Sequence, residues 1–245
     1  MKARIKRTGC YRLLQRIRWN VKARLLPYDK AYARTKNGEF FLNTKSWQTA
    51  PLPCQYGKTY LCYEEEESKQ FEELIEKGDM VFDIGAQVGY YTLLAVKTGA
   101  GRVYALDIMN TYVREAKRQV ALNGFESKVE VLRVALGKKD GEPLTFQNYF
   151  SKTKMKSVTL DTFCKEKNIV PNVIKIDVQG NELAVLEGAK EILKTHKPKI
   201  IVMLYDELLK ERNQTKEEGI ALLENAGYAV KLFAEDHAYL ALPKS

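Results

Sequence analysis

Four residues in the middle of the chain have the types and the spacing of a ligand site. Asp83, Gly85 and Gly89 lie within the stretch VFDIGAQVGYYT, and Asp107 ends the apolar stretch RVYALD. Glycines that directly follow an apolar strand predict a tight turn into a helix, whose first N–H groups then face a bound carboxylate or other anion. Carboxylates beside them bind amino and hydroxyl groups. The pattern therefore predicts a site for a ligand that carries all three kinds of group.

The spacing of the glycines separates two candidate cofactors. A dinucleotide site has the pattern G-x-G-x-x-G, but Gln87 and Tyr90 stand at its second and third glycine positions, so NAD is disfavoured. The pattern D-x-G-x-x-x-G suits S-adenosylmethionine, because it leaves room for an uncharged thioether chain and supplies Asp83 for the amino group. Asp107, 24 residues further on, is expected to accept hydrogen bonds from both ribose hydroxyls. The alternative is a glycine turn that serves only strand–helix packing.

From residue 80 onward, apolar strands alternate with amphipathic helices. This alternation predicts an α/β fold with a mostly parallel sheet that helices cover on both faces. Such sheets bind ligands at the carboxyl ends of their strands, where Asp83 and Asp107 are expected. The expected strands are 80–84, 102–108, 128–136, 172–178 and 199–206, with a closing antiparallel hairpin at 228–235 and 238–243, and the expected helices are 90–99, 110–124, 157–168, 181–195 and 215–227.

Other segments surround this alternating core. Residues 64–78 are expected to form a helix, whose acidic start, Glu64–Glu67, is solvated and matches the helix dipole. Residues 38–63 predict short strands or a cap, and residues 137–154 predict a hairpin. We therefore divide the chain into an N-terminal extension, 1–63, with a basic helix and a cap, and a main domain, 64–245.

The excess positive charge of the chain lies in its first 30 residues. The whole chain has a net charge of +9, and residues 1–30 contain ten Lys and Arg and a single acidic residue. The apolar residues of this segment recur every three or four positions, which predicts an amphipathic helix. Three interpretations stay open: the helix docks on its own domain, it contacts an anionic membrane peripherally, or it contacts the phosphates of RNA.

Cysteine and histidine usage predicts neither disulfides nor a metal site. Cys10, Cys54, Cys62 and Cys164 form no C-x-x-C pair, and the two histidines do not combine with them at metal-site spacing. We therefore expect a reducing, cytoplasmic environment. No stretch has the length and apolarity of a membrane-spanning helix, and the N-terminus lacks the apolar region of a secretory signal.

Several segments resemble the FkbM-type methyltransferases that use S-adenosylmethionine. In chain order they are VFDIGAQVGYYTLLA, NGFESKVEVLRVALGKKDG, SVTLDTF and NVIKIDVQGNELAVLEGAKEIL, from about residue 78 to 204. The resemblance implies a class I, Rossmann-like methyltransferase fold with seven strands, S-adenosylmethionine as the methyl donor, and usually O-methylation of a sugar, glycan, polyketide or similar hydroxyl. The cofactor-binding residues that it implies are Asp83, Gly85, Ala86, Gln87, Gly89, Asp107, Ile108, Ala135 and Leu136.

The resemblance also implies residues that act on the acceptor. Methyl transfer is an in-line displacement, so the enzyme must align the reactants and remove the proton of a hydroxyl acceptor. Asp177, which ends the fourth parallel strand, is the first candidate for the base; the alternative is that it binds only the methionine part of the cofactor or the next helix. The implied reaction-side residues are Lys175, Asp177, Gln179 and Glu182, and Tyr205 and His237 are further candidates at the same edge of the sheet.

The chain departs from the family pattern at four positions. Gln87 replaces the asparagine that commonly follows Gly-Ala, and Ile108 replaces a proline after the acid of the second strand. Gln179 stands where glutamate is frequent, and Met203 stands where an acid often ends the fifth strand. The last two departures remove carboxylates from the reaction side. The acceptor pocket is expected to have walls from residues 142–156 and from Trp47, Tyr56, Tyr60 and Tyr63.

The sequence thus predicts a methyltransferase for a small-molecule, glycan or lipid-linked acceptor, and peripheral membrane contact stays one of the three interpretations of residues 1–30. One alternative is an RNA methyltransferase that holds phosphates with residues 1–30. Another is a sensor or scaffold that binds S-adenosylmethionine without turnover, which the missing acids at 179 and 203 favour. The sequence does not specify the acceptor, the choice between O- and N-methylation, or the oligomeric state.

Overall fold

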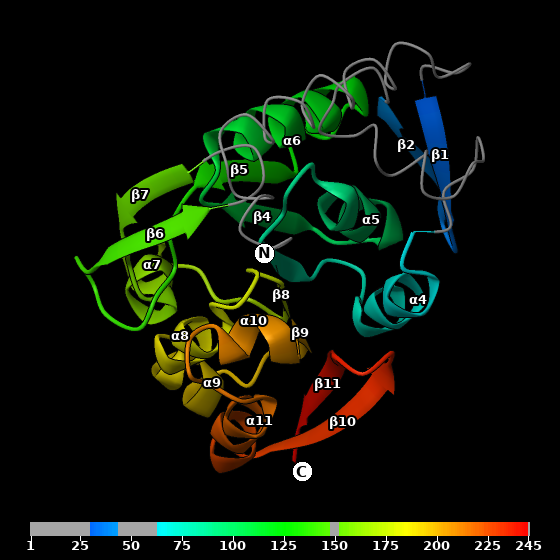
Figure 1. Cartoon of the computed structure of the whole chain (residues 1–245). Helices are drawn as coiled ribbons and strands as arrows, with labels where there is room; N and C mark the ends of the chain where they lie inside the picture. Colours follow the sequence, from blue (N-terminus) through cyan, green and yellow to red (C-terminus); the bar gives the residue numbers. More distant parts are fainter. Residues whose placement is uncertain (1–29, 44–62, 148–151, 245) are drawn as a thin grey trace, which may run out of the picture.

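The computed structural model describes residues 30–43, 63–147 and 152–244 (Figure 1). Three parts of the expected elements lie outside these residues: residues 1–29 of the basic segment 1–30, residues 44–62 of the cap (with Trp47, Tyr56 and Tyr60), and residues 148–151 of the hairpin 137–154. None of the described helices is long and apolar enough to cross a membrane.

The described residues form a central sheet of seven strands in the order β10-β11-β9-β8-β3-β4-β5. All neighbouring strands are parallel except for β11, which runs antiparallel to both β9 and β10. The predicted mostly parallel sheet with an antiparallel hairpin at its edge is therefore confirmed. The strands are β3 (Met80–Ile84), β4 (Arg102–Asp107), β5 (Val129–Arg133), β8 (Val173–Ile176), β9 (Lys199–Met203), β10 (Tyr228–Ala234) and β11 (Ala238–Pro243).

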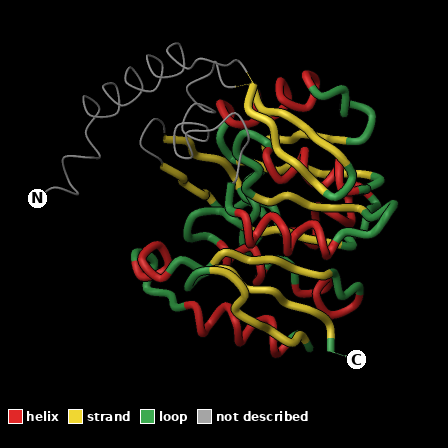
Figure 2. Tube along the Cα trace, turned by 90° about the vertical axis from the view of Figure 1, so that its right-hand side faces the viewer, coloured by secondary structure: helices red, strands yellow, loops and turns green. Residues whose placement is uncertain are grey.

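Helices cover both faces of the sheet (Figure 2). The side chains of each strand alternate between two buried apolar clusters: Val81 of β3 belongs to the cluster under α4, α5 and α6, and Phe82 to the cluster under α7, α8, α9 and α11. The sheet is thus the middle of three layers. The helices are α4 (Glu65–Leu74), α5 (Tyr90–Thr98), α6 (Asn110–Leu122), α7 (Leu160–Lys167), α8 (Glu182–Glu187), α9 (Lys190–Thr195), α10 (Asp206–Lys210) and α11 (Lys216–Asn225).

Two small hairpins flank the main sheet. The first, β1 (Lys30–Thr35) with β2 (Gly38–Asn43), buries Phe40 and Leu42 in the same cluster as α5 and α6. Its edge is bound to α6, because the Asn123 side chain bonds the backbone N–H and C=O of Phe41. β1 has no counterpart among the expected strands. The second hairpin, β6 (Pro143–Gln147) with β7 (Lys152–Lys156), confirms the expected one.

The expected helix at 181–195 is wrong in one respect, because it is two helices. Gly188 separates α8 from α9, and a Cβ at this position would overlap the carbonyl oxygen of Gly137. Asp161 of α7 then accepts hydrogen bonds from the first N–H groups of α9, those of Glu191 (2.9 Å) and Ile192 (3.0 Å).

The expected helix at 64–78 ends earlier than predicted, at Leu74, because Ile75 is extended. Its acidic start is also only partly solvated: Glu65 and Glu66 are exposed, but Glu67 is buried and Glu64 faces a cavity. Helix α10 was not expected from the sequence.

Candidate active site

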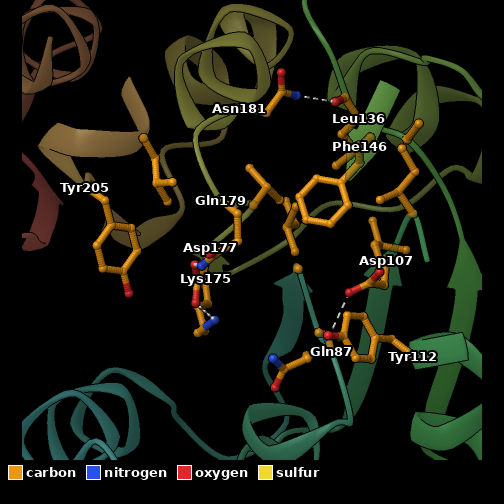
Figure 3. A pocket seen from close by; sticks show the side chains of 18 of the residues that line it. Gln87, Asp107, Tyr112, Leu136, Phe146, Lys175, Asp177, Gln179, Asn181 and Tyr205 are labelled. Carbon is orange, nitrogen blue, oxygen red and sulfur yellow. Dashed lines mark hydrogen bonds and ion pairs between the residues drawn. The ribbon is translucent and has the colours of Figure 1, made fainter. Parts of the chain in front are cut away.

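A cavity of about 1140 Å³ opens at the carboxyl ends of β3, β4 and β8. It lies where the strand order reverses, since β4 and β5 follow β3 on one side and β8 and β9 lie on the other. Figure 3 shows Asp107 and Tyr112 toward one end, Tyr205 toward the other, and Asp177 with Lys175 between them. Among the expected site residues, the cavity is lined by Gly85, Ala86, Gln87, Asp107, Ile108, Ala135, Leu136, Lys175, Asp177, Gln179 and Tyr205.

The turn between β3 and α5 closes tightly over the end of β8. Gly85 has φ +87, and a Cβ at this position would overlap the carbonyl oxygen of Asp177. Gln87 also lies in the left-handed region, with φ 50, which is uncommon for a residue other than glycine. This backbone path brings the N–H of Gln87 to Asp107. Gly89, with φ 91, is the N-cap of α5 and is not among the described residues that line the cavity.

Asp107 accepts two backbone hydrogen bonds at the end of β4. The N–H of Gln87 donates to its Oδ2 (3.0 Å), and the N–H of Met109 donates to its Oδ1 (2.7 Å). Each carboxylate oxygen keeps capacity for a further donor from the cavity. Burial raises the pKa of Asp107 to about 6, against the opposing effect of these two bonds.

Asp83 and Lys175 form a buried pair in adjacent parallel strands. They are directly opposite in the register of β3 and β8, and their side chains are almost inaccessible to solvent. Thr92 donates to Oδ2 of Asp83 (2.6 Å), whereas Oδ1 has no hydrogen-bond partner among the described residues and lies 3.9 Å from Nζ of Lys175. Burial opposes the charge of Lys175, but Asp177 and Asp83 hold its pKa above the ordinary value.

Asp177 is held from two sides at the end of β8. Gln179 donates its amide hydrogen to Oδ1 (3.0 Å), and Nζ of Lys175 lies 3.7 Å from Oδ2. Gln179 has φ 57, so the backbone of this loop is also left-handed at a residue other than glycine. The carboxylate thus faces the cavity in a fixed orientation.

Glu182 and His237 do not line the cavity within the described residues. Glu182 is fully buried and accepts the N–H groups of Val178 (2.9 Å) and Gly180 (2.9 Å), so it fixes the loop that carries Asp177. Burial raises the pKa of Glu182 to about 7. His237 lies behind Tyr205, with the two rings stacked at 4.2 Å between centroids.

Three residues of the site carried no functional signal in the sequence. Glu64 lines the cavity beside α4, and Tyr91 of α5 donates its hydroxyl hydrogen to Oε2 of Glu64 (2.8 Å). Asn181 donates from its side chain to the carbonyl of Leu136 (3.0 Å), which ties the β8 loop to the segment after β5. Tyr63, an expected wall of the acceptor pocket, does line the cavity.

The charges along the cavity favour a cationic ligand. Its described lining contains five carboxylates, Glu64, Asp107, Asp177, Glu207 and Glu211, but only two cationic side chains, Lys175 and Arg212. The unpartnered Oδ1 of Asp83 adds negative charge behind this lining. A nucleoside with a positively charged side chain matches this distribution, because Asp107 suits its hydroxyls and the acids suit its charge. The described residues contain no group of three His, Cys, Asp or Glu that could hold a metal ion.

Comparison with known proteins agrees with this geometry. Residues 83–230, more than half of the chain, match the family described as "Methyltransferase FkbM domain". The structure is similar to that of the methyltransferase FkbM from Methylobacillus flagellatus KT, with a TM-score of 0.54 and 17% identity, over 94% of this chain and 59% of that one. The sheet order and the family match identify the class I, Rossmann-like methyltransferase fold. The chain belongs to the FkbM methyltransferase family, and its cofactor is S-adenosylmethionine.

Shorter similarities extend to a second group of methyltransferases. The ribosomal protein L11 methyltransferase of Caldanaerobacter subterraneus subsp. tengcongensis is 37% identical over 62 residues, which are 25% of this chain and 20% of that protein. The enzyme of the same name from Anoxybacillus flavithermus is 40% identical over 60 residues, 24% of this chain and 19% of that protein. The chain thus spans about a fifth of the length of these curated relatives.

Proposed function

We propose that this protein transfers a methyl group from S-adenosylmethionine to a hydroxyl of a sugar, glycan, lipid-linked or secondary-metabolite acceptor in the cytoplasm. The observation that carries the proposal is the position of Asp177. Its carboxylate faces the cavity between the end that holds Asp107 and the end that holds Tyr205 (Figure 3). The cavity exceeds the roughly 300–1,000 Å³ of a single small-molecule site, which leaves room for donor and acceptor together.

The residues around the β3–α5 turn fit the cofactor. Asp107 would accept the ribose hydroxyls with its remaining lone pairs, and the backbone at Ala135 and Leu136 would border the adenine. Asp83 and the cavity-facing acids would balance the positive charge of the methionine part. When bound, the cofactor supplies an electrophilic methyl group on a sulfonium. The proposed cofactor-binding set is Asp83, Gly85, Ala86, Gln87, Gly89, Asp107, Ile108, Ala135 and Leu136.

Asp177 is the proposed carboxylate for the acceptor. It would accept a hydrogen bond from the acceptor's hydroxyl and assist the loss of its proton as the new bond forms. Lys175 and Gln179 would keep it oriented, and Glu182 would hold its loop. Tyr205 would border the acceptor, while His237 would act only through Tyr205, as a positioning residue.

The lining charges support an uncharged acceptor over RNA. Glu64, Glu207 and Glu211 all line the cavity, so a phosphate group at the acceptor position would meet carboxylates. The basic residues 1–30 are proposed to hold the enzyme against an anionic membrane surface, where lipid-linked acceptors lie. The N-terminal extension is proposed to end at residue 63, where the main domain begins. Its first hairpin shares a core cluster with α5 of the main domain.

The test supplies methyl-labelled S-adenosylmethionine to the full chain together with separate panels of hydroxylated sugars and glycolipids, RNA, and ribosomal protein. Label in an alkali-stable ether of a sugar or glycolipid, lost in Asp177→Asn, supports the proposal. Label in RNA or in ribosomal protein would show that this macromolecule is the acceptor and would overturn the proposed one. Binding of S-adenosylmethionine without transfer to any panel would instead favour a sensor or scaffold.

A further inference from the structure

Glu64 and Asp177 line one cavity and are linked through Tyr91 and Lys175. The ring of Tyr91 faces Nζ of Lys175, 4.5 Å from the ring centre, while its hydroxyl donates to Glu64 (2.8 Å). Lys175 in turn lies 3.7 Å from Asp177 and 3.9 Å from Asp83. Three acids therefore surround one ammonium group, and the cluster has a net negative charge when all of them are ionised.

The backbone at Glu64 supports a functional role for its side chain. Its φ of 43 and ψ of 64 lie in the left-handed region, which is strained for a residue other than glycine. Glu64 does not offset this strain by capping α4, because its side chain makes no cap hydrogen bond. Strain of this kind is typical of functional positions. Here it directs the carboxylate toward Tyr91 and the cavity.

The positive charge of the cofactor is the reason to connect Glu64 with the reaction. We propose that Glu64 holds a proton in the free enzyme, releases it when the cationic cofactor binds, and receives the acceptor's proton during methyl transfer. This inference rests on the proposed function. In the transfer, the acceptor's oxygen bonds to the methyl carbon, the carbon–sulfur bond breaks with its electron pair left on sulfur, and the hydroxyl proton passes to the pair of Asp177 and Glu64. The net charge of the occupied cavity is then the same before and after the step, which a low-dielectric site favours.

The surroundings of Glu64 agree with this sequence of protonation. Burial raises the pKa of Glu64, and Asp177 adds to the effect, while Tyr63, Lys175 and Tyr91 oppose it. The carboxyl therefore retains its proton at a higher pH than an exposed glutamate. A positive charge placed in the cavity would favour the ionised form. The titratable groups that act on Glu64 are Tyr63, Tyr91, Lys175, Asp177 and Tyr205.

The test measures the protons released on binding, without any acceptor. The full chain is titrated with S-adenosylmethionine and with S-adenosylhomocysteine at pH values between about 5 and 8, in two buffers of different ionisation enthalpy. The two ligands have the same ribose, amino and carboxyl groups, so protons released by Asp107 contribute equally to both. The difference between the ligands reports the response to the sulfonium charge.

We expect more proton release with S-adenosylmethionine than with S-adenosylhomocysteine in the wild type and in Glu65→Gln, an exposed neighbour with the same change of charge. Glu64→Gln should abolish the difference. Tyr91→Phe should move it to higher pH, because Glu64 loses a hydrogen bond that favours its ionised form. An equal release with both ligands in the wild type, or an unchanged difference in Glu64→Gln, would overturn the inference. Failure of the folded wild type to bind either ligand would instead overturn the proposed function.

Discussion

The Nζ atom of Lys175 lies 3.9 Å from Oδ1 of Asp83, a buried oxygen that has no hydrogen-bond partner in the described part of the chain. The two residues are register partners in β3 and β8, at the edge of the sheet where the cavity opens. Lys175, on the strand next to it, thus supplies an opposite charge for Asp83, beside the hydrogen bond that Thr92 donates. A substitution that changes the charge of either residue is therefore expected to change the stability of the sheet as well.

Removal of one partner should therefore be more harmful than removal of both. Lys175→Met leaves Asp83 as an uncompensated buried charge and should lower the free energy of unfolding by about 3–5 kcal/mol. The double variant Lys175→Met with Asp83→Asn should recover a large part of this loss. Urea unfolding of the wild type, both single variants and the double variant measures the coupling. Strictly additive effects would show that the two charges do not interact.

A methyl group at Gly85 should disrupt the turn that closes over β8. Gly85→Ala combines φ +87 with an overlap on the carbonyl of Asp177, and we expect a loss of stability of roughly 3 kcal/mol or more. Gly78→Ala is the matched control, because Gly78 has φ +96 but no atom within 4 Å of the added Cβ. This control should lose only about 1–2 kcal/mol. Thermal unfolding of the two variants and the wild type measures both losses of stability. Equal losses in Gly85→Ala and Gly78→Ala would refute the close approach of the turn to β8.

The affinity for S-adenosylhomocysteine should fall in mild acid. Asp107 accepts hydroxyl donors with both oxygens only when it is ionised, and burial raises its pKa to about 6. The carboxylate is therefore present above this pH and lost below it, with a decrease in affinity of up to about tenfold per pH unit. S-adenosylhomocysteine is the probe because it has no sulfonium charge to affect Glu64. In Asp107→Asn the affinity should be lower at neutral pH and nearly constant through this range; a wild-type profile that is flat down to about pH 5 contradicts this role.

The sequence predicted the sheet because short, largely apolar runs such as RVYALD alternate with amphipathic helical segments. Asp107 was placed correctly at the end of its strand for the same reason. The two-helix form of 181–195 could not be predicted, since the carbonyl of Gly137 and the capping carboxylate of Asp161 come from distant parts of the chain.

Glu64 was missed for a related reason. In the sequence it is the first of four consecutive glutamates, which together have the pattern of a solvated helix start. Its contact with Tyr91 depends on the packing of α4 against α5, which local sequence does not encode. The buried position of Lys175 was likewise invisible, because a lysine inside an apolar strand shows no partner until the register of β3 and β8 is known.

The central claim is that the cavity at the ends of β3, β4 and β8 binds S-adenosylmethionine through Asp107. The most direct measurement is calorimetric titration of S-adenosylmethionine into the wild type, Asp107→Ala and Glu126→Gln, an exposed acid away from the cavity. We predict saturable binding by the wild type and the control, and binding by Asp107→Ala that is weaker by about 1–3 kcal/mol, or roughly 5- to 150-fold. Absence of binding by the folded wild type, or equal affinity in Asp107→Ala, would contradict the claim.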